Sequence, residues 1–167
     1  MERLWAPWRM EYIEGIGEKE NACIFCAKPA ENKDAENFIL YRGKKVFIIL
    51  NTFPYSNGHL LIAPYRHTAD LTDLSPEESQ ELLSAASLGI KALKETMRPE
   101  GFNLGMNLGR IAGAGIAGHL HLHIVPRWGG DTNFMATCGE TKVIPESLSA
   151  TLDKLRQALA SREGKDA

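Results

Sequence analysis

The chain contains the stretch Gly118-His119-Leu120-His121-Leu122-His123-Ile124-Val125-Pro126-Arg127, in which three histidines alternate with aliphatic residues. Alternate side chains of an extended strand share a face, so the pattern predicts a β-strand that places the three histidines on one face and the aliphatic residues in the core. Imidazole offers a proton, a lone pair or a nucleophilic nitrogen near neutral pH. One such histidine would fit an ordinary half-buried strand, whereas three in register indicate metal binding, proton transfer or covalent catalysis.

Length and composition are typical of a single domain with one core. The chain has 167 residues, of which 44% are hydrophobic, and its net charge of −2 gives no sign of the broad basic surface that nucleic-acid binding needs. No stretch approaches the roughly 20 apolar residues of a membrane helix, and the start of the chain lacks a signal-peptide pattern. We therefore expect a cytoplasmic protein without a nucleic-acid or membrane partner.

The three cysteines are an odd number and too few for a disulfide framework. The close pair in Cys23-Ile24-Phe25-Cys26 is either a redox motif or half of a tetrahedral zinc site. Polar segments flank the pair at 18–21 and 28–37, which is unlike the strand and helix that frame a thioredoxin-like motif. Zinc would need two more ligands, which the histidines can supply. Cys138 is expected to be a small, partly buried side chain.

β-Rich runs predict five strands. The runs at 38–41 and 46–50 read as a hairpin around the turn at 42–45, and the run at 59–63 follows as a third strand that Pro64 ends. Two more strands are predicted at 102–108 and 119–125. We expect them to form one antiparallel sheet.

Capping and periodicity predict two helices. Ser75 is a suitable N-cap, Pro76 suits the first turn and Glu78 completes a capping box, while Pro99 and Gly101 end the run. The apolar stripe expected in the core consists of Leu82, Leu83, Ala86, Ile90, Leu93 and Met97. A C-terminal helix is predicted at about 146–161, with its apolar face formed by Leu148, Leu152, Leu155 and Leu159. Strands followed by a helix, then strands and a helix again, predict an α+β fold with a five-stranded antiparallel sheet.

A glycine-rich loop at 107–118 joins the last two predicted strands, and four of its twelve residues are glycine. Glycine allows backbone N–H groups to approach an anion closely, although many glycine-rich loops are simply flexible. Because this loop leads directly into the histidine strand, we favour a phosphate-binding role. It matches no Walker or dinucleotide-fold fingerprint.

The histidine pattern at 119–125 resembles the signature of the histidine-triad (HIT) superfamily of nucleotidyl hydrolases and transferases, which is His-x-His-x-His followed by two apolar residues. The resemblance covers nearly the whole chain. Further stretches similar to the bacterial diadenosine tetraphosphate phosphorylase branch lie at 4–10, 51–55 with 58–59, 126–131 and 142–145. It implies one HIT domain over 1–167, with the cysteine pair in an N-terminal segment at 1–35 and a catalytic core at about 36–135.

The resemblance also implies roles for individual histidines. His121 corresponds to the nucleophile that forms a nucleotidyl-histidine intermediate, and His123 and His59 correspond to hydrogen-bond donors beside the phosphates. A structural zinc ion would be held by Cys23, Cys26, His67 and His119. Family members form two-fold dimers that extend the sheet, so a homodimer is expected, and Mg²⁺ is a candidate companion of the polyphosphate substrate.

Five other positions are weaker candidates. Asn51 and Asn107 match family positions that bind ribose or phosphate, but asparagines at strand ends also serve turns. Glycines of the loop, Gly113 and Gly115, could hold phosphate through their amides. Arg127 could bind phosphate or form a surface ion pair.

The acceptor of the nucleotidyl group is left open by a departure from the family pattern. Many hydrolases of the family carry Gln-Ser or Gln-Thr four and three residues before the first triad histidine, where this chain has Gly115 and Ile116. The phosphorylase branch commonly has Ser at the first position and an acidic residue just before the triad, where this chain has Gly115 and Gly118. The extended resemblance to the phosphorylase branch nevertheless makes the leading prediction a phosphorylase that converts diadenosine tetraphosphate and phosphate to ATP and ADP. A hydrolase or phosphoramidase and a non-catalytic nucleotide-binding module are the alternatives.

Overall fold

A computed structural model describes residues 23–131 and 144–163, and the opening stretch at 4–10, Cys138, Lys142 and Val143 lie outside the described residues. The elements follow one another as α2 (Ile24–Ala30), β1 (Ile39–Arg42), β2 (Val46–Leu50), β3 (Leu60–Pro64), the 3₁₀ turn η1 (Leu71–Asp73), α3 (Pro76–Met97), β4 (Gly101–Met106), β5 (Leu122–Arg127) and α5 (Leu148–Glu163). The predicted hairpin, long helix and C-terminal helix are all present.

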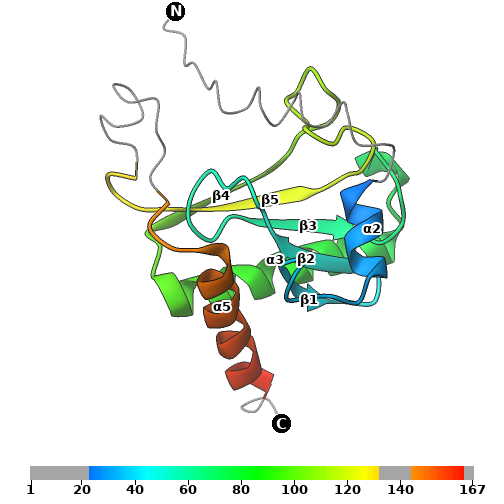
Figure 1. The fold of residues 1–167 in the computed structure, drawn as a ribbon. Helices are drawn as coiled ribbons and strands as arrows, with labels where there is room; N and C mark the ends of the chain where they lie inside the picture. The colour runs from blue at the N-terminus through cyan, green and yellow to red at the C-terminus, as the bar shows by residue number, and fades with distance from the viewer. Residues whose placement is uncertain (1–22, 132–143, 164–167) are drawn as a thin grey trace, which may run out of the picture.

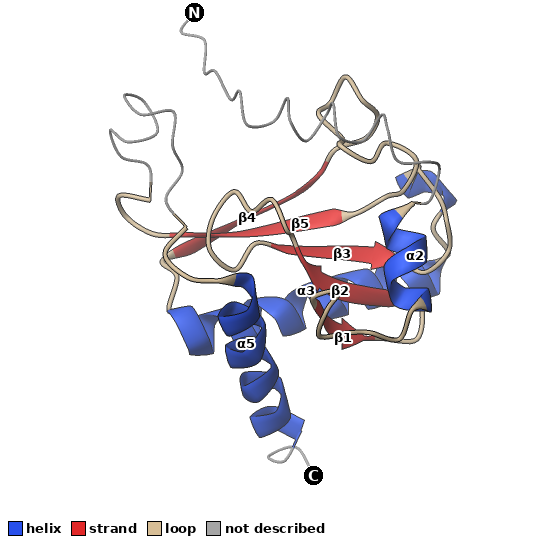
Figure 2. Ribbon diagram, viewed as in Figure 1, coloured by secondary structure: helices blue, strands red, loops and turns tan. Residues whose placement is uncertain are grey.

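The strands form one five-stranded antiparallel sheet in the order β1-β2-β3-β5-β4 (Figure 2). The sheet confirms the predicted α+β class. β5 inserts between β3 and β4, so that the segment with the histidines lies in the interior of the sheet, beside the strand that His59 precedes. β4 is left as an edge strand.

The two faces of the sheet have separate apolar clusters. The larger cluster lies between the sheet and the helices α3 and α5, and includes Ile48, Ile62, Leu93, Ile124 and Leu155. The smaller cluster lies on the other face, which α2 covers; it comprises Phe25, Ile39, Phe47, Ile49, Leu61 and Ala63. Figure 1 shows α3 passing behind the sheet and α2 in front of it. Alternate strand residues therefore divide between the two clusters, as the period of two requires.

Helix α3 begins with the predicted capping box. The Ser75 hydroxyl accepts from the Glu78 N–H at 3.2 Å, and the Glu78 carboxylate accepts from the Ser75 N–H at 2.9 Å. The stripe prediction is wrong for Leu83, whose side chain is 66% exposed, while Leu82 and Ala86 are buried. Leu82 and Ala86 are four residues apart and share the inner face, whereas Leu83 is rotated about 100° away from Leu82.

The histidine stretch keeps its alternation but is not a regular strand throughout. β5 begins only at Leu122, so His119 and His121 precede it. The last paired residues of β3 and β5 are Ile62 and Leu122, and extension of that register would bring Leu120 opposite Pro64, which has no N–H to donate. The Leu120 N–H donates instead to the Thr68 carbonyl at 2.6 Å. The prediction of a strand beginning at His119 is thus wrong by three residues.

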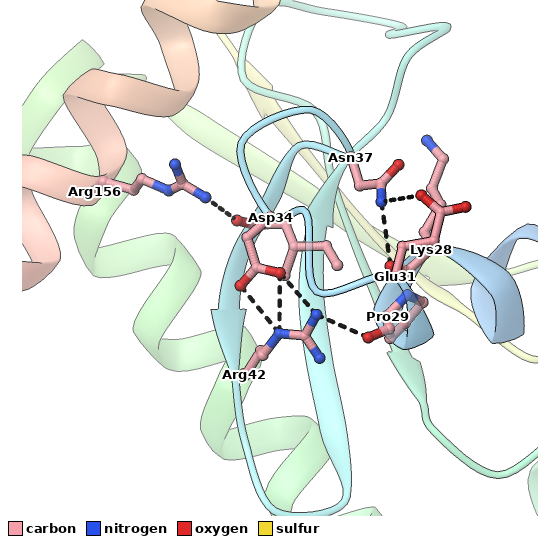
Figure 3. Close-up of polar contacts among 8 residues, drawn as sticks. Lys28, Pro29, Glu31, Asp34, Asn37, Arg42 and Arg156 are labelled. Atoms are coloured by element: carbon pink, nitrogen blue, oxygen red, sulfur yellow. Dashed lines mark hydrogen bonds and ion pairs between the residues drawn. The ribbon is translucent and has the colours of Figure 1, made fainter.

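Helix α2 is attached to the sheet by side chains from its connection to β1 (Figure 3). Arg42 forms a bidentate ion pair with Asp34 and donates to the Pro29 carbonyl at 2.9 Å. Asn37 donates to the Lys28 carbonyl at 3.2 Å. The Arg42 hydrogen bonds are the main cause that lowers the pKa of Asp34. These bonds hold the C-terminal end of α2 against β1.

Within the described residues, none of the helices has the length and apolar character that crossing a membrane requires.

Candidate active site and metal centre

His121 presents one ring nitrogen for chemistry. Its Nδ1 lies 2.8 Å from the His119 carbonyl oxygen, which can only accept, so Nδ1 carries the hydrogen and Nε2 keeps the lone pair. The side chain is buried, and this burial lowers the pKa of His121 below its usual value. His121 is therefore held as a neutral imidazole with a nucleophilic Nε2.

His59 and His123 form a second pair beside His121. The Tyr55 N–H donates to His59 Nδ1 at 3.0 Å, which places the hydrogen of a neutral His59 on Nε2. His59 Nε2 in turn lies 3.0 Å from His123 Nδ1, so His123 carries its own hydrogen on Nε2. The His121 and His123 ring centroids are 4.9 Å apart. The chain of bonds thus makes His123 Nε2 a hydrogen-bond donor next to the candidate nucleophile.

Asn51 contacts this pair through His59. Its Nδ2 lies 3.3 Å from His59 Nδ1, and its Oδ1 accepts from the Phe53 N–H at 2.9 Å. The side chain therefore performs the turn function that asparagine often has at the end of a strand. Its predicted contact with ribose or phosphate stays a prediction.

Four side chains gather where α2 meets the segments before β5 and after β3. Cys23, Cys26, His67 and His119 each direct one ligand atom to a common point, and these atoms lie within 4.8 Å of one another. His119 Nδ1 is 3.2 Å from the Cys23 Sγ and 3.6 Å from the Cys26 Sγ, while His67 Nδ1 is 3.3 Å from the Cys26 Sγ. The ligands of a tetrahedral zinc ion are separated by roughly 3.3–3.8 Å, so the spacing fits this ion.

The chemistry of the donors also fits a metal. His119 Nε2 donates to the Pro64 carbonyl at 2.8 Å, which leaves the lone pair of Nδ1 directed at the cysteines. A second partner of this kind is the usual orienting contact of a metal-bound histidine. Burial lowers the pKa of His119, and desolvation followed by the hydrogen bond with Cys23 raises the pKa of Cys26. Zinc would supply the positive charge that two adjacent thiolates need.

The glycine-rich loop is folded back on itself. Gly113 has a positive φ of 91°, its N–H donates to the Arg110 carbonyl at 2.9 Å, and the Asn107 Nδ2 donates to the Gly113 carbonyl at 3.3 Å. The Gly113 amide is thus already used within the loop, and phosphate could bind it only in exchange for that bond. Phosphate binding by Gly115 and Asn107 stays a prediction.

Arg127 forms the ion pair that was the alternative to phosphate binding. Its Nε and Nη2 contact the two carboxylate oxygens of Asp131 at 2.5 and 2.9 Å, and its Nη1 donates to Asn103 at 2.8 Å. A phosphate would compete with these contacts, so its binding by Arg127 stays a prediction.

Two aromatic residues at the site were not singled out from the sequence. The Tyr55 ring lies 4.7 Å from the His59 ring and is nearly parallel to the His123 ring at 5.9 Å. Phe25 is buried beneath His119 and His121. The sequence offered only two hints of their role. Phe25 lies between the two cysteines, and Tyr55 lies four residues before His59.

The fold and the site define a class: an α+β protein that brings a buried histidine with a free Nε2 lone pair next to a pair of hydrogen-bonded histidines and a Cys2His2 cluster. Comparison with known proteins places the chain within that class. The model of the HIT domain matches residues 32–130, so the chain belongs to the HIT family.

Individual relatives agree with this assignment. The chain is 43% identical to the AP-4-A phosphorylase of Mycobacterium tuberculosis over 157 residues, which cover 90% of this chain and 80% of the relative. A Zn-bound histidine triad family protein from Mycobacterium smegmatis has a similar structure, with a TM-score of 0.70 and 30% identity over 86% of this chain and 97% of the other. A hypothetical histidine triad nucleotide-binding protein from Sulfolobus tokodaii also has a TM-score of 0.70, with 26% identity over 86% and 95% of the two chains. The predicted resemblance to the family and to its phosphorylase branch is confirmed.

Proposed function

We propose that the chain is a nucleotidyl transferase that cleaves dinucleoside polyphosphates through a nucleotidyl-histidine intermediate on His121. The observation that carries this proposal is the hydrogen bond from His121 Nδ1 to the His119 carbonyl, because it leaves Nε2 with its lone pair in a side chain whose pKa burial lowers. A nucleotide-binding module would have no need of such a nucleophile.

The reaction would proceed in two displacements. His121 Nε2 attacks the α-phosphorus, and the bond between that phosphorus and the bridging oxygen breaks, so that the leaving nucleotide departs with the electron pair. An oxygen of the acceptor then attacks the same phosphorus, and the N–P bond breaks and returns the electron pair to Nε2. Hydrogen bonds from His123 and His59 would stabilise charge on the phosphate oxygens during both steps.

Inorganic phosphate is the acceptor that we favour. The support is the 43% identity to an AP-4-A phosphorylase over 90% of this chain. With diadenosine tetraphosphate, transfer of AMP to phosphate gives ADP and releases ATP, whereas transfer to water gives AMP and ATP. A hydrolase or phosphoramidase is the second candidate, because Gly115 and Gly118 stand where the phosphorylase branch commonly has Ser and an acidic residue and so leave the acceptor open. Mg²⁺ is expected to accompany the polyphosphate.

The Cys2His2 cluster would hold a structural zinc ion. Four protein ligands close a tetrahedral site and leave no position for substrate, so the ion would fix the geometry of its ligands rather than polarise a phosphate. His119 would bind this ion through Nδ1, while its carbonyl orients His121. The support is the geometry of the cluster together with the Zn-bound protein of similar structure.

The test is a product analysis with diadenosine tetraphosphate at increasing phosphate concentrations. Wild-type protein should form ATP and ADP, with a turnover rate that rises with phosphate. The variant His121→Ala should retain its fold and bind nucleotide but lose turnover by at least about 10³-fold, since the nucleophile is removed. Formation of ATP and AMP at a rate independent of phosphate would identify a hydrolase. Turnover of His121→Ala equal to that of wild type would exclude covalent catalysis at this residue.

A further inference from the structure

Phe25 lies between the two cysteines of the cluster and directly against the candidate nucleophile. Its side chain is 1% exposed. The ring centroid is 4.8 Å from that of His121, with an angle of 31° between the rings, and 5.3 Å from that of His119. One buried aromatic ring therefore contacts both the nucleophile and a predicted metal ligand.

The contact supplies a constraint that the hydrogen bond of His121 cannot. The bond from Nδ1 to the His119 carbonyl acts in the plane of the imidazole, but it leaves the ring faces unsupported, so that the ring can still tilt by rotation about its Cβ–Cγ bond. Such a turn would swing Nε2 away from the phosphorus, and misplacement of a reacting atom by about 1 Å can cost about 10²-fold in rate. A flat ring packed at a small angle against the imidazole face blocks this rotation.

Phe25 is itself held firmly in place. It belongs to the smaller apolar cluster, and α2 is attached to the sheet through the bond from Arg42 to the Pro29 carbonyl. Cys23 and Cys26 flank it in sequence, so the contacts of their sulfur atoms with His119 and His67 also restrict its position. The position of the ring is thus set by the same segment that carries two of the four predicted ligands.

We propose that Phe25 is a positioning residue for His121: its ring packs against the imidazole face and holds Nε2 in the direction of attack, so that the cysteine-bearing segment and the nucleophile act as one unit. This inference rests on the proposed role of His121 as nucleophile. It assigns to the cysteine-bearing segment a contribution to the rate of the chemical step, beyond its contribution to metal binding.

The test compares Phe25→Leu with Phe47→Leu. Both side chains are buried phenylalanines of the same cluster, at 1% and 0% exposure, but the Phe47 ring packs against Phe25 and Tyr65. Both substitutions should lower Tm by similar amounts, because both leave similar voids. Only Phe25→Leu should lower kcat, by about 10-fold, with KM within about twofold of wild type because substrate contacts are unchanged. Phe25→Met serves as a second variant if Phe25→Leu does not fold.

A second measurement does not depend on turnover. In wild type and Phe47→Leu, the ring-proton NMR signals of His121, identified by their absence in His121→Ala, should be shifted by the ring current of Phe25. In Phe25→Leu this shift should disappear while zinc content stays equal to that of wild type. Equal loss of kcat in both variants, or an unchanged kcat in Phe25→Leu, would overturn the proposal. If His121→Ala retained turnover, the proposed nucleophile would be wrong, whereas the NMR shift would still report the ring contact.

Discussion

His119 uses its two ring nitrogens for different partners, and its backbone for a third. Nε2–H is bonded to the Pro64 carbonyl, Nδ1 faces the cysteines, and the carbonyl of the same residue accepts from His121. Substitution of His119 would therefore disturb the cluster and, through the backbone, the hydrogen bond that orients His121. The proposed functions of metal ligand and nucleophile fall on side chains two residues apart, which an extended backbone places on the same side.

We predict one zinc ion per chain. Zinc that is present at about 100 times its Kd should stabilise the fold by about 2.7 kcal/mol, or roughly 5–10 °C in Tm. Chelation of wild-type protein should remove this increment. Cys26→Ser should bind less zinc and lose a similar increment, since it removes one of four ligands. The measurements are metal analysis and thermal unfolding.

The matched control is Cys138→Ser, which removes a thiol that is not among the predicted ligands and should keep full zinc content. A fully folded protein that contains no zinc and has a Cys23–Cys26 disulfide would contradict the prediction.

At the scale of elements, the start of α3 is tied to the segment that carries His67. Glu78, which closes the capping box of α3, also accepts from Arg66 at 3.1 and 2.8 Å. Its side chain is 8% exposed. The hydrogen bonds from Arg66 are the largest cause that lowers the pKa of Glu78 from 4.5 to about 2. One carboxylate thus joins the long helix to the connection after β3.

The ion pair of Glu78 with Arg66 predicts how the stability of the protein depends on pH. Because the folded-state pKa of Glu78 is lower than its usual value, its stabilisation is complete above pH 4.5 and is lost as the pH falls toward about 2. Glu78→Gln should lower the free energy of unfolding at pH 7 by about 1 kcal/mol, because the ion pair with Arg66 is lost while Gln can still accept from the Ser75 N–H, and it should weaken the acid dependence over this range. Denaturant unfolding at several pH values measures both effects.

Glu77→Gln is the control, because it removes the same charge from the same helical turn and leaves the Arg66 pair intact. An equal loss of stability in the two variants would show that helix-dipole charge alone is responsible.

Local patterns made most of this arrangement predictable. The capping box, the hairpin at 42–45 and the alternation after Gly118 each depend on residues close in sequence, and all are present. The late start of β5 was not predictable, because it depends on Pro64 lying beside Leu120 in space. Leu83 was wrongly assigned to the core because the spacing of apolar residues does not show how wide the buried face of the helix is.

The candidate site was likewise predictable only in part. The resemblance to the family pointed to His59, His67 and the cysteine pair, and the structure brings these residues to the expected clusters. The contacts of Phe25 with His121 and of Tyr55 with His123 join segments that are far apart in sequence, so no local pattern indicated them. The sequence also left Arg127 undecided between phosphate binding and an ion pair. Only the structure shows that it contacts Asp131 and Asn103.

At the scale of the whole molecule, β4 has an open edge. Among the described residues it pairs with β5 alone, and its middle residues Asn103, Leu104 and Gly105 are exposed, with Leu104 at 46%. An open edge with an exposed leucine is a ready site for pairing with another strand. Since family resemblance implies a two-fold dimer that extends the sheet, we expect two copies of this chain to associate through β4.

The prediction is that wild-type protein sediments as a dimer and that Leu104→Lys raises the dimer dissociation constant by at least about tenfold. A leucine buried on association contributes about 1.5–3 kcal/mol, and the two-fold axis would apply the loss twice. Leu83→Lys is the matched control, because Leu83 is an even more exposed leucine, at 66%, on helix α3. It should leave the dimer intact. Equal sedimentation of Leu104→Lys and wild type as dimers would place the interface elsewhere, and a monomeric wild type would contradict the dimer itself.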